Sequence, residues 1–154
     1  MVVLAGYVLG LIVGCAAAAL SYPQGPAQLF AHTMLRYFLP VGVGLTLLFA
    51  SIGHVFKSRI AARRLGWPAD NPFQKELGFW DGAAGVVSLM CFWASTDFWL
   101  AAVVFNAIFW TLAAVNHAWE VVHNRNYAFD NVSTAVVDFL VPVTLIVLYA
   151  VGGR

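Results

Sequence analysis

Five long apolar stretches dominate this sequence, and each approaches the length of helix that crosses a lipid bilayer. A hydrocarbon core about 30 Å thick requires roughly 20 apolar residues in helical conformation. The stretches are continuous rather than alternating between apolar and polar residues, so transmembrane strands are not expected. We therefore predict an all-α, polytopic transmembrane helix bundle, a single domain over residues 1–154, with spans at about 2–21, 37–56, 77–95, 98–123 and 132–151.

Composition excludes the main alternatives to a membrane protein. Hydrophobic residues make up 62% of the chain and charged residues only 10%, and the mean hydropathy is +0.81. A soluble domain averages about 45–50% apolar and about 25% charged residues. The net charge of +1 predicts no nucleic-acid partner, and two cysteines exclude a disulfide-rich secreted module.

The distribution of lysine and arginine predicts the orientation of the bundle. Six of these residues fall in the two links after the second and fourth spans, namely Lys57, Arg59, Arg63, Arg64, Lys75 and Arg125. Only Arg36 and Arg154 fall on the other side. The positive-inside rule then places the N-terminus in the cytoplasm and the C-terminus outside. The membrane we expect is a bacterial inner membrane, in line with the family resemblance described below. The first stretch lacks a basic flank and is long for a signal peptide, so we interpret it as a retained helix.

Small residues recur every fourth position along the first span. Gly6, Gly10, Gly14 and Ala18 would form one face on which another helix can approach closely. Two partners are open at this stage. The face packs against the other helices of this chain, or it holds another membrane subunit or a second copy.

A set of polar residues interrupts the predicted spans at a similar depth on the cytoplasmic side. A polar or ionisable group inside a span is costly unless it is paired or hydrated, so each is a candidate site residue. Four spans contribute to this set: His54, Glu76, Asp81, Asn106, Asn116, His117, Glu120 and Asp138. His117 and Glu120 are three residues apart on one helix face, the spacing at which an imidazole and a carboxylate share a metal, and His54 could add a third ligand.

Four interpretations of this polar layer are open. It is a hydrogen-bonded structural network, a site for a ligand or quinone headgroup, a metal site, or a proton or ion path. A second His and carboxylate pair, which a di-metal bundle requires, is not evident. The sequence identifies no cofactor.

Three short motifs resemble the DoxX/DoxD-like superfamily of small bacterial membrane proteins. They are the run from Leu39-Pro40 to Ser51-Ile52-Gly53-His54, then Leu65-Gly66-Trp67-Pro68, then Phe73-Gln74-Lys75-Glu76-Leu77-Gly78. Ser51 departs from the glycine usual in that pattern, and residues 116–120 look like the end of the next helix in relatives of the group. The resemblance covers about residues 36–151. It implies a four-helix core, with the first helix as an addition, and an association with membrane redox systems such as a quinone-reducing thiosulfate oxidoreductase. No active-site residue carries over.

Two functions are consistent with these features. The first is an accessory or stabilising subunit of a larger membrane complex, possibly a redox complex, since no complete catalytic constellation is present and an enzyme is not favoured. Its partners would be the bilayer and other membrane subunits or a second copy, held through the first helix. The alternative is a small membrane protein that acts alone and binds a quinone, lipid or metal at the polar layer.

Overall fold

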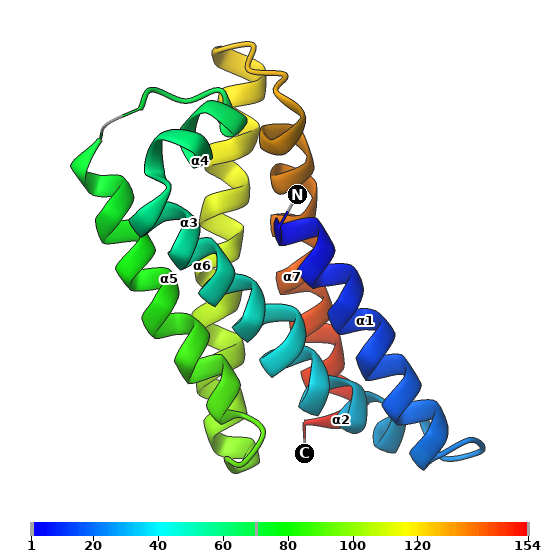
Figure 1. Ribbon diagram of the computed structural model, residues 1–154. Coiled ribbons are helices and arrows are strands. Elements are labelled where there is room, and N and C mark those ends of the chain that lie inside the picture. The colour runs from blue at the N-terminus through cyan, green and yellow to red at the C-terminus, as the bar shows by residue number, and fades with distance from the viewer. Residues whose placement is uncertain (1, 70, 154) are drawn as a thin grey trace.

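The computed structural model describes residues 2–69 and 71–153, and within these ranges every regular element is helical. The elements are shown in Figure 1. They are α1 (Val2–Ser21), α2 (Ala27–Tyr37), the π-helical segment η1 (Phe38–Leu45), α3 (Thr46–Phe56), α4 (Ser58–Leu65), α5 (Pro72–Met90), α6 (Thr96–His123) and α7 (Phe129–Gly152). The predicted all-α class is confirmed.

The second helix is longer than its apolar stretch predicted. The elements α2, η1 and α3 form one continuous helix that begins at Ala27 rather than Tyr37. Polar residues such as Gln28 hid its first turns in the sequence, although its face with Ala31 and Leu35 is buried. Pro40 has no amide proton to donate to an α-helical bond, and it lies where the helix widens into the π-helical turn.

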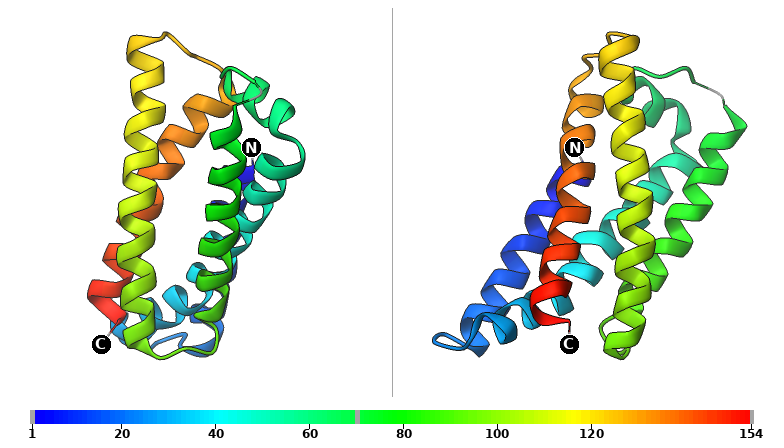
Figure 2. Two further views of the ribbon diagram at one scale, coloured as in Figure 1. Left: turned by 90° about the vertical axis from the view of Figure 1, so that its left-hand side faces the viewer. Right: turned by 180° about the vertical axis from the view of Figure 1, so that it is seen from behind.

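Four helices are long and apolar enough to cross a membrane: α1, the continuous Ala27–Phe56 helix, α6 and α7. The third predicted span, α5, does not reach that level because it carries Lys75, Glu76 and Asp81. The views in Figures 1 and 2 nevertheless show α5 running the length of the bundle beside α3.

Helix boundaries differ from the predicted ones by several residues. The element α5 begins at Pro72, where Asn71 Oδ1 accepts a hydrogen bond from the Phe73 amide at 3.0 Å, and it ends at Met90 rather than near Ser95. The short link to α6 is therefore residues 91–95, closed by a 2.8 Å bond from Trp99 Nε1 to the Cys91 carbonyl. The last helix begins at Phe129, not Val132.

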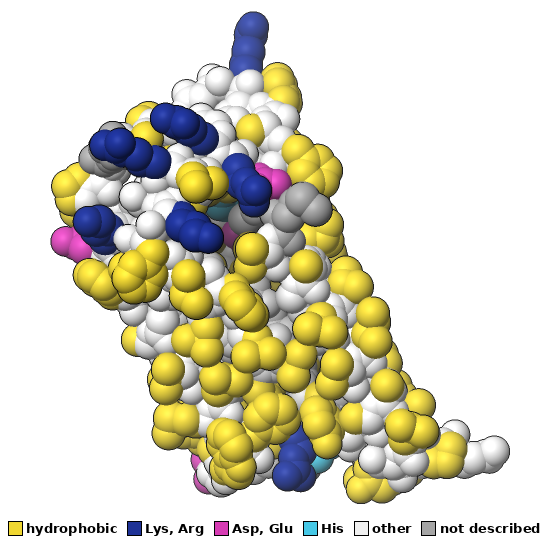
Figure 3. All heavy atoms as spheres, viewed as in Figure 1, with side chains coloured by type: hydrophobic (Ala, Val, Ile, Leu, Met, Phe, Trp, Pro, Cys, Tyr) yellow, Lys and Arg dark blue, Asp and Glu magenta, His cyan; other side chains and the backbone are white. Residues whose placement is uncertain are grey.

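Charged side chains gather at the ends of the bundle. On the face in Figure 3, lysine and arginine side chains cluster around α4 and the neighbouring end of α5, and hydrophobic side chains cover the middle. Arg36 lies near the end of α2, away from that cluster, and Arg154 is outside the described residues. A bundle with an apolar belt between charged ends has the surface expected of a protein surrounded by lipid.

The small-residue face of α1 is covered by this chain's own second helix. A Cβ added to Gly10 would lie 2.4 Å from Gly42 Cα, and one added to Gly14 would lie 3.1 Å from Met34 Cγ. Gly6 lies against Thr46 in the same way, and Ala18 is fully buried. Of the two partners predicted for this face, the intramolecular one occupies it.

Glycines also bring α5 close to the second helix. A Cβ added to Gly85 would lie 2.9 Å from the Gly44 carbonyl oxygen, and one added to Gly78 would lie 2.9 Å from His54 Cβ. In contrast, α5 and α6 make few contacts, while α6 packs extensively on α7. The left view in Figure 2 shows α5 and α6 standing apart along most of their length.

Candidate functional site

A partly open cavity of about 230 Å³ lies between α3, α5, α6 and α7. Its walls include one polar residue of the predicted layer from each of α3, α5 and α7 and two from α6: His54, Asp81, Asp138, Asn116 and His117. Asp81 and Asp138 are each only 3% exposed. None of the described residues that line the cavity is a lysine or an arginine. The only basic side chains among the described residues of this wall are therefore the two histidines.

His117 is held in a defined orientation by the first turn of α7. Its Nδ1 lies 2.7 Å from Asn131 Oδ1, and Asn131 Nδ2 donates to the Asn126 carbonyl at 3.0 Å. Because the amide nitrogen of Asn131 is committed to a carbonyl, its oxygen faces the imidazole, and Nδ1 of His117 is the donor. In the neutral ring, Nε2 of His117 is then an acceptor.

His54 is oriented in the complementary way by the first turn of α5. Gln74 Nε2 lies 3.0 Å from the Ser58 carbonyl and 3.3 Å from His54 Nδ1. An amide nitrogen only donates, so His54 Nδ1 accepts and the neutral ring carries its proton on Nε2. One histidine of the cavity is thus set to donate through Nε2 and the other to accept.

Four buried side-chain polar atoms have no hydrogen-bond partner among the described residues. One is Asn106 Oδ1, outside the cavity, and the other three belong to residues that line it. These three are the indole Nε1 atoms of Trp67 and Trp110 and the Oδ1 atom of Asp138. Trp67 also stacks on His117, with ring centroids 4.9 Å apart and an interplanar angle of 19°. Buried polar groups are nearly always satisfied in folded proteins, so three such atoms around one cavity indicate a place for a polar ligand.

An apolar groove of about 510 Å³ lies beside this cavity, between α5 and α6. Its walls include Trp80 of α5, whose ring centroid lies 3.8 Å from that of Phe109 of α6. Leu77 and Phe109 line both the groove and the polar cavity, so these two side chains lie at the boundary between them.

The remaining predicted site residues lie outside the cavity. Glu120 lines an adjoining space of about 410 Å³ together with His54 and accepts a 2.7 Å bond from Asn124 Nδ2. Glu76 is exposed on the edge of the apolar groove. Asn106 is fully buried and donates to Ser88 Oγ at 3.1 Å and to the Ala102 carbonyl at 2.8 Å, linking α6 to α5.

The candidate metal ligands are not assembled. Within residues 2–69 and 71–153, no group of three or more His, Cys, Asp or Glu side chains is arranged to hold a metal ion. His117 and Glu120 share a helix face as predicted, but Glu120 is not among the residues that line the cavity with His117. The metal interpretation stays a prediction.

Sequence reasoning missed four residues of this site: Gln74, Trp67, Trp110 and Asn131. Tryptophans near span ends are explained by their preference for the membrane interface, so Trp67 gave no separate signal. Asn131 was placed in a link, yet it lies seven residues before Asp138, two helical turns away on the same face. Extending that face backwards from Asp138 would have found it.

The fold and this site define a helical membrane-type bundle with a polar cavity between its helices. The chain belongs to DUF6790, a family of unknown function whose model matches residues 1–154. No curated protein and no solved structure matches the chain. These comparisons provide no link to the DoxX/DoxD-like superfamily, so that resemblance stays a prediction.

Proposed function

We propose that this protein binds a lipid-soluble small molecule of the quinone class, with its headgroup in the polar cavity. The observation that carries the proposal is the set of three unsatisfied buried atoms, on Trp67, Trp110 and Asp138, around one cavity. A purely structural network would be expected to satisfy its own members.

Hydrogen-bond chemistry favours a headgroup that carries two oxygen atoms. The carbonyl oxygens of a quinone accept, and the indole N–H groups and His54 Nε2 are donors. The hydroxyls of the reduced form donate, and His117 Nε2 and Asp138 Oδ1 are acceptors. Both forms of one headgroup therefore find partners on the same walls.

Size favours a ligand with a tail. Pockets that enclose a drug-sized ligand measure about 300–1,000 Å³, and this cavity measures only about 230 Å³. It accommodates a headgroup and leaves the rest of the molecule outside. The apolar groove between α5 and α6 lies directly beyond Leu77 and Phe109, and its apolar walls suit a tail that leaves the cavity on this side of the bundle.

The same proposal includes the membrane arrangement predicted from the sequence. We propose that α5 is a fifth crossing element, its acidic Asp81 turned into the cavity and away from lipid. With five crossings, the basic residues around α4 are cytoplasmic, as is the N-terminus, and the C-terminus is outside, in a bacterial inner membrane.

The accessory-subunit hypothesis has weaker support. It relied on the glycine face of α1 to hold a partner, and that face is covered by the second helix of the same chain. A role in a membrane redox complex, which the DoxX/DoxD-like resemblance implies, stays a prediction.

A binding titration tests the proposed site. Purified protein in lipid nanodiscs is titrated with decylubiquinone while tryptophan fluorescence is recorded. We expect saturable quenching that Trp110→Phe reduces and that Asp138→Asn weakens about tenfold or more, because a buried hydrogen-bonding partner is lost or altered. Trp119→Phe on the same helix is the matched control, since Trp119 is exposed and stacks on His123.

The contrary result is equally clear. Quenching that is linear in decylubiquinone and unchanged by Asp138→Asn, or reduced equally by both tryptophan variants, would mean that the probe only partitions into the surrounding lipid. The cavity would then not be its binding site.

A further inference from the structure

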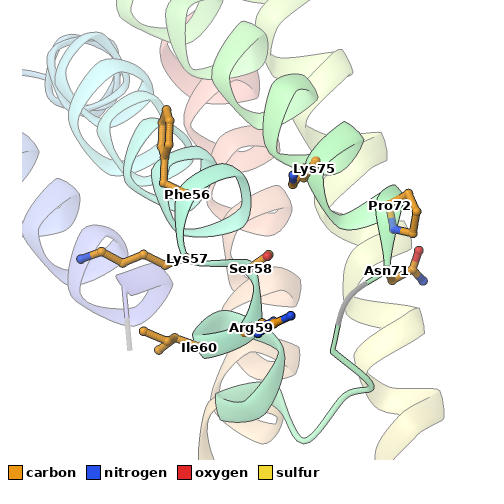
Figure 4. Close-up of a pocket in the computed structure, with 8 residues that line it drawn as sticks. All are labelled: Phe56, Lys57, Ser58, Arg59, Ile60, Asn71, Pro72 and Lys75. Carbon is orange, nitrogen blue, oxygen red and sulfur yellow. The ribbon is translucent and has the colours of Figure 1, made fainter.

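A second and larger hollow lies at the charged end of the bundle, where α3 ends and where both α4 and α5 begin. It measures about 640 Å³ and shares no lining residue with the polar cavity. Figure 4 shows residues from the end of α3 and the first turns of α4 on one side of it, and residues from the start of α5 on the other. We call it the basic cleft and define it by Phe56, Lys57, Arg59, Ile60 and Lys75.

The cleft is suited to an anion. Lys57, Arg59 and Lys75 line it, and none of the described residues in its wall is acidic. Segment 57–75 carries five basic residues and one acidic residue, Asp70, which gives it a net charge of +4 (5 − 1). The N-terminal ends of α4, at Ser58, and of α5, at Pro72, also line the cleft, and helix N-termini carry partial positive charge.

Apolar side chains stand next to these charges. Phe56 is 79% exposed and Ile60 is 54% exposed. In Figure 4, Phe56 extends away from α4, along the direction in which α3 and α5 enter the bundle, and the Lys57 side chain extends toward α1, so it must turn toward Lys75 to share one phosphate. A soluble anion gains nothing from Phe56 and Ile60, whereas a molecule with a charged head and an acyl chain contacts both kinds of side chain.

We propose that the basic cleft binds the headgroup phosphate of an anionic phospholipid. Lys57 and Lys75 hold the phosphate from the two sides of the cleft, and an acyl chain runs along Phe56 toward the apolar belt. Arg59 already has an interaction of its own, and the proposal assigns the phosphate to the two lysines. The site is independent of the quinone-class ligand in the polar cavity, because the two spaces share no wall.

Native mass spectrometry of the detergent-purified protein tests the site. The protein is titrated with phosphatidylglycerol, with phosphatidylcholine and with inorganic phosphate. We expect retention of phosphatidylglycerol in preference to phosphatidylcholine, and about a thirty-fold loss of that affinity in the double variant Lys57→Gln and Lys75→Gln. Phe56→Ser should weaken the lipid several-fold without changing the response to phosphate.

A charge-matched control separates a defined site from general attraction. Arg63 and Arg125 are exposed on the same end of the bundle and do not line the cleft, so the double variant Arg63→Gln and Arg125→Gln should bind as the unmodified protein does. The variant Lys57→Arg and Lys75→Arg keeps both charges and should retain binding, and thermal unfolding confirms that each variant is folded.

Two results would overturn the proposal. Equal losses in the two glutamine double variants would mean that only the summed positive charge attracts lipid. Inorganic phosphate binding as tightly as phosphatidylglycerol, with no effect of Phe56→Ser, would mean that the cleft is a site for a free anion.

Discussion

The two sides of α5 differ sharply in how they are packed. On one side, glycines bring α5 against η1 and α3. The helix that contains η1 in turn approaches α1, where Gly42 meets Gly10. We call this the glycine interface. On the other side, the backbones of α5 and α6 stand farther apart and are joined by side chains such as Trp80 and Phe109, and the polar cavity and the apolar groove lie along the boundary. We call this the open interface.

The difference separates the part of the bundle that holds it together from the part available for a ligand. Close backbone approach through small residues stabilises helix pairs in a membrane, where lipid provides no hydrophobic driving force between helices. The open interface instead contains the indole N–H groups of Trp67 and Trp110 and the Oδ1 atom of Asp138, which have no hydrogen-bond partner among the described residues. Changes on the glycine interface should therefore affect stability, and changes on the open interface should affect binding.

The largest effect should come from filling the glycine interface. In Gly10→Val the new side chain would meet the backbone of Gly42, which cannot move aside as a side chain would. We expect a loss of about 3 kcal/mol or more in the free energy of unfolding, measured by denaturation in detergent. Gly53→Ala is the matched control, because a Cβ there meets nothing within 4 Å. It should be neutral or stabilise the helix by up to about 1 kcal/mol. Equal losses in both variants would contradict the close-contact explanation.

The next largest effect should separate two buried asparagines. Asn131→Ala removes the partner of His117, and Asn106→Ala removes the link to Ser88, so each should cost about 1–3 kcal/mol of stability. Only Asn131→Ala should also weaken decylubiquinone binding, because only Asn131 orients a side chain of the cavity. Parallel unfolding and binding curves provide the check, and identical binding losses would remove the distinction between the two positions.

A smaller effect should follow from narrowing the passage between groove and cavity. Leu77→Trp places a larger ring where the two spaces meet, and we expect about a tenfold loss of decylubiquinone affinity with a change in stability below about 1.5 kcal/mol. Leu140→Trp, on the exposed face of α7, is the control and should bind normally. Unchanged binding in Leu77→Trp would show that the tail does not follow the groove.

The smallest effect should come from Glu76. It was among the predicted site residues, but it is exposed on the edge of the groove. Glu76→Gln should change both stability and ligand affinity by no more than about 0.5 kcal/mol. A tenfold change in affinity would mean that the headgroup lies nearer the groove than the cavity does.

Local signals in the sequence were enough to predict the helices but not how they pack. Length and hydropathy act within one segment, so the apolar stretches predicted five of the long helices with boundary errors of a few residues in most cases. The start of the second helix at Ala27 was missed because Gln28 and His32 are polar, so the apolar stretch begins only after them. Such residues are tolerated where a helix lies at the membrane surface. Pro40 marks the place of the π-helical segment in the sequence, but the packing of this segment against α1 and α5 follows from no local pattern.

The residues of the candidate site also fall into two groups, those that the sequence predicted and those that it did not. His54, Asp81, His117 and Asp138 stood out because polar groups are costly in hydrocarbon, and the structure places them around one cavity. Trp67 and Trp110 did not stand out, because an aromatic residue in a membrane protein needs no special explanation. Their unsatisfied N–H groups become visible only once the surrounding atoms are placed.

The central claim, a lipid-soluble ligand in the polar cavity, is tested most directly by what the protein carries when purified from bacterial membranes. Solvent extracts of the detergent-purified protein are analysed by mass spectrometry for isoprenoid quinones, in parallel with extracts of two variants. One is Asp138→Asn, and the other is the control Asp97→Asn, which lies in the first turn of α6, at the end of that helix away from the cavity. We predict near-stoichiometric quinone in the unmodified protein and in Asp97→Asn, and a marked depletion in Asp138→Asn. Equal quinone content in all three, or none above the level of bulk membrane lipid, would contradict the claim.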